Sequence, residues 1–296
     1  MESIREIIKK IRRLEIRTRR MVDESVAGQY HSVFRGRGMN FEDVRPYQVG
    51  DDTRSIDWNV TARSGEPHIK IYTEERELTI LLALDLSGSG IYGSVERSKK
   101  EIAAELASVL AFSAVRNNDQ VGLLLFTSQK ELFLRPAKGR SHALRIIREA
   151  LFYEPQQQGT DVGAALEFLG RLPLRRAVLF VLSDFICPDF ERALMVAARK
   201  HDVVAARLED PAEHQLPKVG WVSLQDPESG ELIEVNTSDP IARAEWERAR
   251  LAQRERVEAT LQRQNVDLID IRVDQDYLPK LRGFFRRRER RMLLHM

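Results

Sequence analysis

The chain has a single cysteine, Cys187, among 296 residues, so an intrachain disulfide bond is impossible. That usage is typical of a reducing compartment. Apolar runs are short, and none approaches the ~20 residues that a membrane-spanning helix needs. The N-terminal residues also lack the uninterrupted apolar stretch of a signal peptide. We therefore expect a soluble, cytoplasmic protein with a core of ordinary size.

Motifs of several enzyme classes are also missing. The sequence has no His-Glu-x-x-His zinc motif and no Gly-x-Ser-x-Gly nucleophile elbow. Residues 88–93 begin like a phosphate-binding loop, but Ser94 and Val95 stand where Lys and then Ser or Thr are required. The six histidines are scattered, and Cys187 has no obvious base beside it, so we interpret it as a packed thiol. The missing lysine of the phosphate-binding loop argues against nucleotide hydrolysis.

Positive charge is concentrated at the two ends, although the net charge is only +2. Residues 1–22 contain eight Lys or Arg and three Glu, and residues 280–296 contain seven Lys or Arg and one Glu. Such ends attract anionic lipid, nucleic acid or an acidic partner, or they form ordinary solvated helix faces. Apolar residues recur at helical spacing within residues 4–14, which predicts an amphipathic helix that docks on its own fold.

From residue 78 onward, apolar strands alternate with helices. The predicted strands are residues 79–84, 121–126, 131–134, 177–182, 203–208 and 266–271, and the predicted helices are 94–116, 141–151, 162–172, 190–200 and 240–264. This alternation predicts an α/β fold with a doubly wound, mostly parallel sheet covered on both faces. We expect three segments: the N-terminal helix with a small irregular or β-rich module (1–77), the α/β core (78–210) and a C-terminal extension with a long helix, a further strand and a basic tail (211–296).

Oxygen-bearing side chains follow or precede three of these elements. Asp85, Ser87 and Ser89 come directly after the strand 79–84, Thr160 precedes the helix 162–172, and Asp184 follows the strand 177–182. In an open parallel sheet the loops after the strands meet at the edge where ligands bind. Carboxylate and hydroxyl oxygens suit a small hard cation such as Mg²⁺ or Mn²⁺. The structural alternative is that the serines cap the next helix and Asp85 accepts backbone N–H groups.

This ordered set of five residues resembles the metal-ion-dependent adhesion site of von Willebrand factor type A domains. The resemblance implies that Ser87 and Ser89 bind Mg²⁺ directly and that Thr160 binds it when a ligand is engaged. It implies that Asp85 and Asp184 act largely through water. A carboxylate from a protein partner then takes the open coordination position.

A second resemblance covers most of the chain. Residues 38–77 contain Pro46-Tyr47, Gly50-Asp51-Asp52 and Ile56-Asp57-Trp58, and this block is similar to the bacterial domain-of-unknown-function family fifty-eight. Members join such a block to a von Willebrand A-like domain. The resemblance implies a link to a MoxR-type AAA+ ATPase, as partner or adaptor in assembling or activating client proteins. Within the block we expect the aromatic residues, Trp58 among them, to pack, while its arginines either pair locally or form a docking face.

Taken together, these features predict a metal-dependent, chaperone-like adaptor for protein–protein interaction, and not an enzyme. One alternative is a Mg²⁺-dependent hydrolase that uses Asp85 and Asp184, for which the sequence offers no identifiable base or nucleophile. The other is nucleic-acid binding through the basic ends. Only Phe284 and Phe285 come close to the interleaved aromatic residues that base stacking requires.

Overall fold

A computed structural model describes residues 4–22, 30, 33, 40–73, 77–88, 97–225 and 232–294. The chain divides into a small unit, residues 34–78, and a large unit that contains the rest. This division differs from the three expected segments, because helix α1 (Ile4–Met21) belongs to the large unit. There α1 packs against α4 (Lys99–Arg116) and α5 (Arg140–Phe152).

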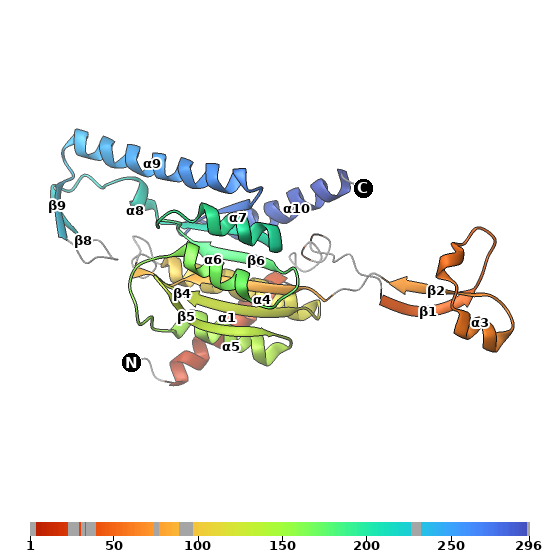
Figure 1. Ribbon diagram of the computed structural model, residues 1–296. Helices are drawn as coiled ribbons and strands as arrows, with labels where there is room; N and C mark the ends of the chain where they lie inside the picture. Colours follow the sequence, from red (N-terminus) through yellow and green to blue (C-terminus); the bar gives the residue numbers. More distant parts are fainter. Residues whose placement is uncertain are drawn as a thin grey trace. The chain divides into compact units, whose positions relative to one another are not determined.

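In the described part of the large unit, six strands form one sheet in the order β10-β7-β6-β3-β4-β5 (Figure 1). Their bounds are β3 (Thr79–Asp85), β4 (Gln120–Phe126), β5 (Lys130–Ala137), β6 (Val178–Ser183), β7 (Asp202–Glu209) and β10 (Asp267–Arg272). All neighbouring pairs are parallel except β4 and β5, which form an antiparallel edge. The predicted doubly wound, mostly parallel sheet is thus confirmed.

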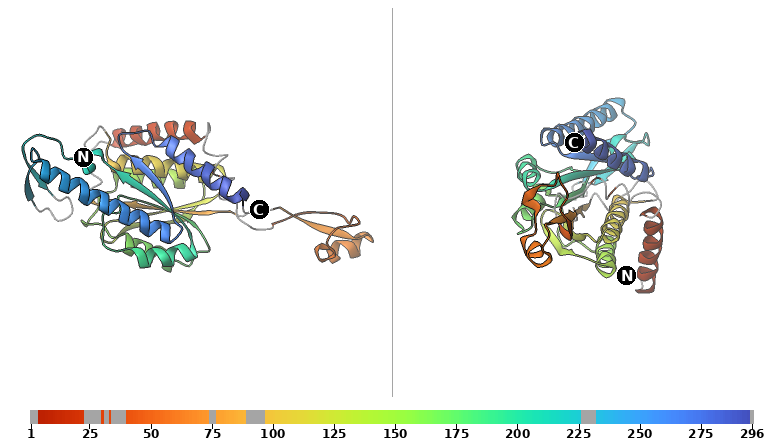
Figure 2. Two further views of the ribbon diagram at one scale, coloured as in Figure 1. Left: turned by 90° about the horizontal axis from the view of Figure 1, so that it is seen from above. Right: turned by 90° about the vertical axis from the view of Figure 1, so that its right-hand side faces the viewer.

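Helices cover both faces of this sheet (Figure 2). Leu81 and Ala83 of β3 pack in one core with α6 (Val162–Arg171), α7 (Glu191–Lys200) and the C-terminal half of α9 (Pro240–Arg263). The opposite face carries α4, α5 and α10 (Leu278–Leu294), and α1 lies outside α4. Because both faces are covered, the central strands read as unbroken apolar runs rather than alternating ones.

The chain order creates a switch point between β3 and β6. From β3 the chain adds β4 and β5 toward one edge, then returns to place β6, β7 and β10 toward the other. Ligands of open α/β sheets bind outside the carboxyl ends of strands where the order reverses in this way. Asp85 ends β3 and Asp184 directly follows β6, so both lie at that point.

Beyond β7 the chain forms a short helix, a hairpin and a long helix. Helix α8 (Pro211–His214) is capped by Asp210, and β8 (Trp221–Gln225) pairs with β9 (Leu232–Asn236). Helix α9 begins after its N-cap residue Asp239, whose carboxylate accepts the Ile241 N–H at 2.8 Å. None of the helices that the structure describes is long and apolar enough to cross a membrane.

The small unit contains an antiparallel pair, β1 (Asn40–Pro46) and β2 (His68–Thr73), with η2 (Thr53–Ser55) and α3 (Trp58–Ser64) between them. Arg45 donates two hydrogen bonds to Asp51, at 2.8 and 2.7 Å, so at least this arginine pairs locally. The expectation that Trp58 packs is wrong. It is the first residue of α3, a helix without buried residues, and is 71% exposed.

Candidate metal centre at the ends of β3 and β6

The Asp85 carboxylate is held by the two central strands. Its Oδ1 accepts the Ser87 N–H at 2.9 Å, and its Oδ2 accepts the Ser183 hydroxyl at 2.6 Å. The Leu86 N–H donates to the Phe126 carbonyl of β4 at 2.9 Å, which fixes the turn after β3. A strand end, a tight turn and the neighbouring strand therefore set the position of this carboxylate.

Asp184 is bound by a lysine from another element. Its Oδ1 accepts the Ile186 N–H at 2.9 Å, and its Oδ2 accepts a hydrogen bond from Lys99 Nζ at 2.7 Å. Lys99 Nζ also donates to Glu213 of α8, and the lysine side chain is only 4% exposed. One cavity of about 10 Å³ is lined by seven residues: Asp85, Ser87, Lys99, Lys100, Ser183, Asp184 and Leu208. That is roughly the space of one water-sized sphere.

Three carboxylates (Asp85, Asp184 and Glu213) and two ammonium groups (Lys99 and Lys100) lie at this cavity or are hydrogen-bonded to the residues that line it. Burial and the nearby charge of Asp184 raise the pKa of Asp85 to about 7, although hydrogen bonds from Ser183 and Ser87 oppose the shift. Burial disfavours the ammonium form of Lys99, but Asp184 and Glu213 outweigh it and raise the pKa of Lys99. One ammonium is thus shared by two carboxylates, and Asp85 is a third carboxylate beside them.

The two remaining predicted ligands, Ser89 and Thr160, are not among the described residues that line this cavity. Ser89 lies outside the described residues. Thr160 is buried and precedes Asp161, whose N–H donates to the Thr127 carbonyl at 3.0 Å and whose carboxylate caps α6 through the Ala164 N–H at 2.8 Å. The structure therefore brings Asp85, Ser87 and Asp184 to one cavity and anchors the Thr160 loop to the turn that follows β4.

Cys187 joins the Thr160 loop to the Asp184 loop. Its sulfur is hydrogen-bonded by the backbone of Val162 and is within electrostatic range of Asp85, Asp184 and Asp161. Burial, followed by these carboxylates, raises the pKa of the thiol to about 12. The low fraction of thiolate suits the interpretation of Cys187 as a packed thiol rather than a nucleophile.

Glu131 is hydrogen-bonded to the loop that precedes Thr160, and the sequence patterns did not identify it. Its carboxylate accepts the N–H groups of Gln156 at 3.1 Å and Gln157 at 3.0 Å, and the Thr127 hydroxyl at 2.8 Å. Burial opposes ionisation of Glu131, but these hydrogen bonds together lower its pKa. A lone Glu in a short predicted strand carries no sequence signal for this role.

The structure bears on part of the structural alternative for the serine motif. Asp85 does accept a backbone N–H, as that alternative expects. Helix α4, however, is capped by Ser98, whose hydroxyl accepts the Glu101 N–H at 3.2 Å in a capping box. Ser87 is therefore not the cap of α4.

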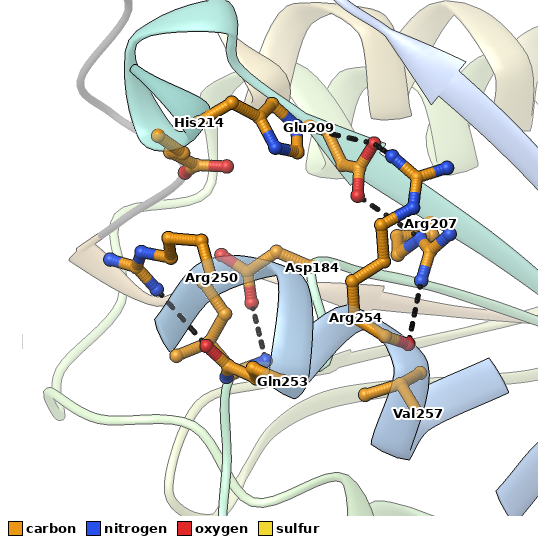
Figure 3. Close-up of a pocket in the computed structure, with 10 residues that line it drawn as sticks. Asp184, Arg207, Glu209, His214, Arg250, Gln253, Arg254 and Val257 are labelled. Atoms are coloured by element: carbon orange, nitrogen blue, oxygen red, sulfur yellow. Dashed lines mark hydrogen bonds and ion pairs between the residues drawn. The ribbon is translucent and has the colours of Figure 1, made fainter. Parts of the chain in front are cut away.

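A second cavity, of about 30 Å³, is also lined by Asp184 (Figure 3). Arg207 of β7 is wholly buried there and donates to Asp270 of β10 at 2.6 and 2.8 Å and to Glu258 of α9 at 2.6 Å. Arg254 of α9 adds a hydrogen bond to Asp270 at 2.7 Å. This network holds α9 and β10 against β7 and so builds one wall beside the site.

The cavity offers oxygen donors of the kind that divalent cations prefer. The carboxylates of Asp85 and Asp184 and the hydroxyls of Ser87 and Ser183 line it, together with two lysines, Lys99 and Lys100. No group of three or more His, Cys, Asp or Glu side chains suited to a metal occurs among the described residues, so a site here depends on hydroxyl ligands as well. Lys99, Ser183 and Glu213 are site residues that only the folded chain reveals.

A doubly wound, mostly parallel sheet with a switch point between β3 and β6 defines the class: an open-sheet α/β domain. The sequence matches the family described as "Protein of unknown function DUF58" over residues 43–256, and the chain belongs to that family. The match confirms the resemblance to the domain-of-unknown-function family fifty-eight.

Two relatives and two solved structures illustrate the similarity. The uncharacterized protein Rv1480 of Mycobacterium tuberculosis is 31% identical over 95% of this chain and 89% of its own length. The uncharacterized protein YeaD of Bacillus subtilis is 23% identical over 60% of this chain and 42% of its own. The crystal structure of the conserved hypothetical protein BatB from Bacteroides thetaiotaomicron has a TM-score of 0.47 at 18% identity, covering 72% of this chain and 99% of that one. The SpRpn10 VWA domain has a TM-score of 0.39 at 14% identity, covering 70% and 94%.

Proposed function

We propose that this protein is a metal-dependent protein-interaction adaptor that docks a partner's carboxylate at the ends of β3 and β6. The observation that carries the proposal is the pair Asp85 and Asp184 in one small cavity, where, with Glu213, three carboxylates face the two ammonium groups of Lys99 and Lys100. A hard divalent cation would relieve this excess, and it would attract an anionic oxygen from a partner.

Ser87 and Ser89 are the proposed direct ligands of Mg²⁺ or Mn²⁺, and Thr160 joins them when a partner is bound. Asp85 and Asp184 act through water, which suits carboxylates whose oxygens already accept protein hydrogen bonds. The bound metal would supply positive charge at an open coordination position. The chain's own groups then orient the ligands: Ser183 holds Asp85, and Lys99 holds Asp184.

The partner that we propose is a MoxR-type AAA+ ATPase or its client, with an Asp or Glu side chain at the metal. Two strand ends and their turns fix the site, so it presents a pre-organised surface to such a side chain. Binding rather than catalysis is the proposed role, because the site needs no base or nucleophile for it.

The metal is tested directly by Mn²⁺ relaxation of solvent water with the full chain. Wild type should enhance relaxation, and Asp85→Ala should abolish the enhancement, because it removes a carboxylate that lines the cavity. Equal enhancement by both proteins would contradict the metal assignment.

The partner is tested by biolayer interferometry against a purified MoxR-type ATPase, in Mg²⁺ and then in EDTA. Ser87→Ala combined with Ser89→Ala should abolish binding, as should EDTA. The matched control combines Ser141→Ala with Ser223→Ala, two exposed serines away from the site. ATPase binding that persists in both EDTA and the Ser87/Ser89 variant would exclude the metal edge as the docking site.

A further inference from the structure

Helix α10 presents two different faces. Leu281, Phe284 and Phe285 are buried, and the ring of Phe284 lies 6.5 Å from that of Phe180 in β6. The opposite face is exposed and consists of four arginines followed by two leucines: Arg286, Arg287, Arg290, Arg291, Leu293 and Leu294. At 100° per residue these six positions fall within about half the helix circumference. The buried face fixes the helix to the sheet, so the arginine face is presented outward.

Positive charge on this outward face is poorly compensated. Arg288 pairs with Asp202 and Asp267, and Arg291 pairs with Asp267. In contrast, Arg286, Arg287 and Arg290 form no ion pair within the part of the chain that the structure describes. Glu289 is the only acidic residue of α10. The outward face therefore matches an anionic surface.

Aliphatic side chains distinguish among anionic partners. Leu293 is 67% exposed and Leu294 is 84% exposed, and both extend the arginine face by one further turn. Exposed leucines next to arginines are what an interfacial helix inserts among lipid headgroups. Stacking on nucleic-acid bases would need exposed aromatic rings, but Phe284 and Phe285 point into the core.

We propose that the outward face of α10 docks on an anionic phospholipid surface. The arginines bind lipid phosphate and carboxylate groups, and Leu293 and Leu294 insert beside them. In Figure 1 the C-terminal end of α10 extends past the strands of the sheet, which leaves these turns accessible within the large unit. This surface is separate from the strand-end site and does not depend on the proposed function.

Co-sedimentation of the full chain with vesicles tests the proposal. We expect binding to phosphatidylserine–phosphatidylcholine vesicles, little binding to phosphatidylcholine alone, and weakening as salt rises. The variant Arg286→Gln/Arg287→Gln/Arg290→Gln should bind at least roughly tenfold more weakly, because each arginine near the surface contributes to attraction. Leu293→Ser/Leu294→Ser should also weaken binding, by removing the inserted groups.

The matched control removes three exposed arginines from α7 and α9, as Arg192→Gln/Arg248→Gln/Arg256→Gln, and should bind vesicles like wild type. Circular dichroism of all variants should coincide with wild type, since the changed side chains are exposed. Unchanged vesicle affinity in either α10 variant overturns the proposal. So does preferential binding to a single-stranded DNA oligonucleotide over phosphatidylserine vesicles, or equal loss in the control.

Discussion

Replacing Lys99 by methionine is the sharpest test of the charge arrangement at the strand-end site. The change removes the ammonium that is hydrogen-bonded to Asp184 at 2.7 Å and also to Glu213. Methionine is a good helix former, so the first turn of α4 should persist. The expected effect is therefore electrostatic: Asp184 loses its cation while it remains buried.

The magnitude follows from the burial of the pair. The side chains of Lys99 and Asp184 are 4% and 3% exposed, so solvent screens them little. Removing one partner of such a pair typically lowers the free energy of unfolding by about 3–5 kcal/mol. A divalent cation at the site would replace the missing charge. At a hundred times its dissociation constant it would return roughly 2.7 kcal/mol.

Urea unfolding of the full chain, in EDTA and in saturating Mn²⁺, measures both effects. We expect Lys99→Met to be much less stable than wild type in EDTA and to gain more than wild type from Mn²⁺, because no ammonium competes for Asp184. The control Lys218→Met removes an exposed lysine and should resemble wild type in both conditions. Equal stability of wild type and Lys99→Met in EDTA, or equal Mn²⁺ gains, would refute the reasoning.

Three further outcomes are expected. Asp85→Asn should not destabilise the protein in EDTA above pH 7. The pKa of Asp85 is raised to about 7 in the folded chain, so ionisation of this carboxyl lowers the free energy of unfolding as pH rises toward 7. Urea unfolding as a function of pH measures this, and a clear loss of stability in the variant would contradict it. Burial, with nearby Lys200, lowers the pKa of His201 below its usual 6.5. Because the unfolded chain then takes up a proton that the native chain does not, stability should fall as pH drops below about 6.5. His201→Gln should flatten that slope, and an unchanged slope would argue against the assignment. The pKa of about 12 predicts that Cys187 resists iodoacetamide at mildly alkaline pH until urea unfolds the chain, as mass spectrometry would show.

Local patterns in the sequence predicted most of the large unit. The strands found at Thr79–Asp85 and Gln120–Phe126 differ from the predicted bounds by one residue at one end. Runs buried on both faces are strongly apolar, and caps such as Asp239 leave a local signal at the start of a helix. The antiparallel edge strand, Lys130–Ala137, is longer than expected because its partly exposed end carries polar residues.

The small unit was harder to predict because few of its described side chains, in residues 44–70, are buried. Trp58 is aromatic, and composition alone favours a buried position for it. The fold instead places it on α3, a short helix with no buried residues. Burial of a side chain depends on which surfaces the tertiary structure brings against it, and a seven-residue helix offers no periodicity from which to judge this.

By itself, the sequence determined the elements and the edge of the sheet at which Asp85 and Asp184 lie. Strand ends and chain order are encoded locally, and parallel connections bring those ends together. Only the tertiary structure decided what surrounds them. Lys99 and Glu213 are 114 positions apart along the chain, yet they meet beside Asp184, because α4 begins where the short helix α8 lies. An ion pair between residues so far apart in the chain has no characteristic sequence spacing, because the packing of the helices brings the two side chains together.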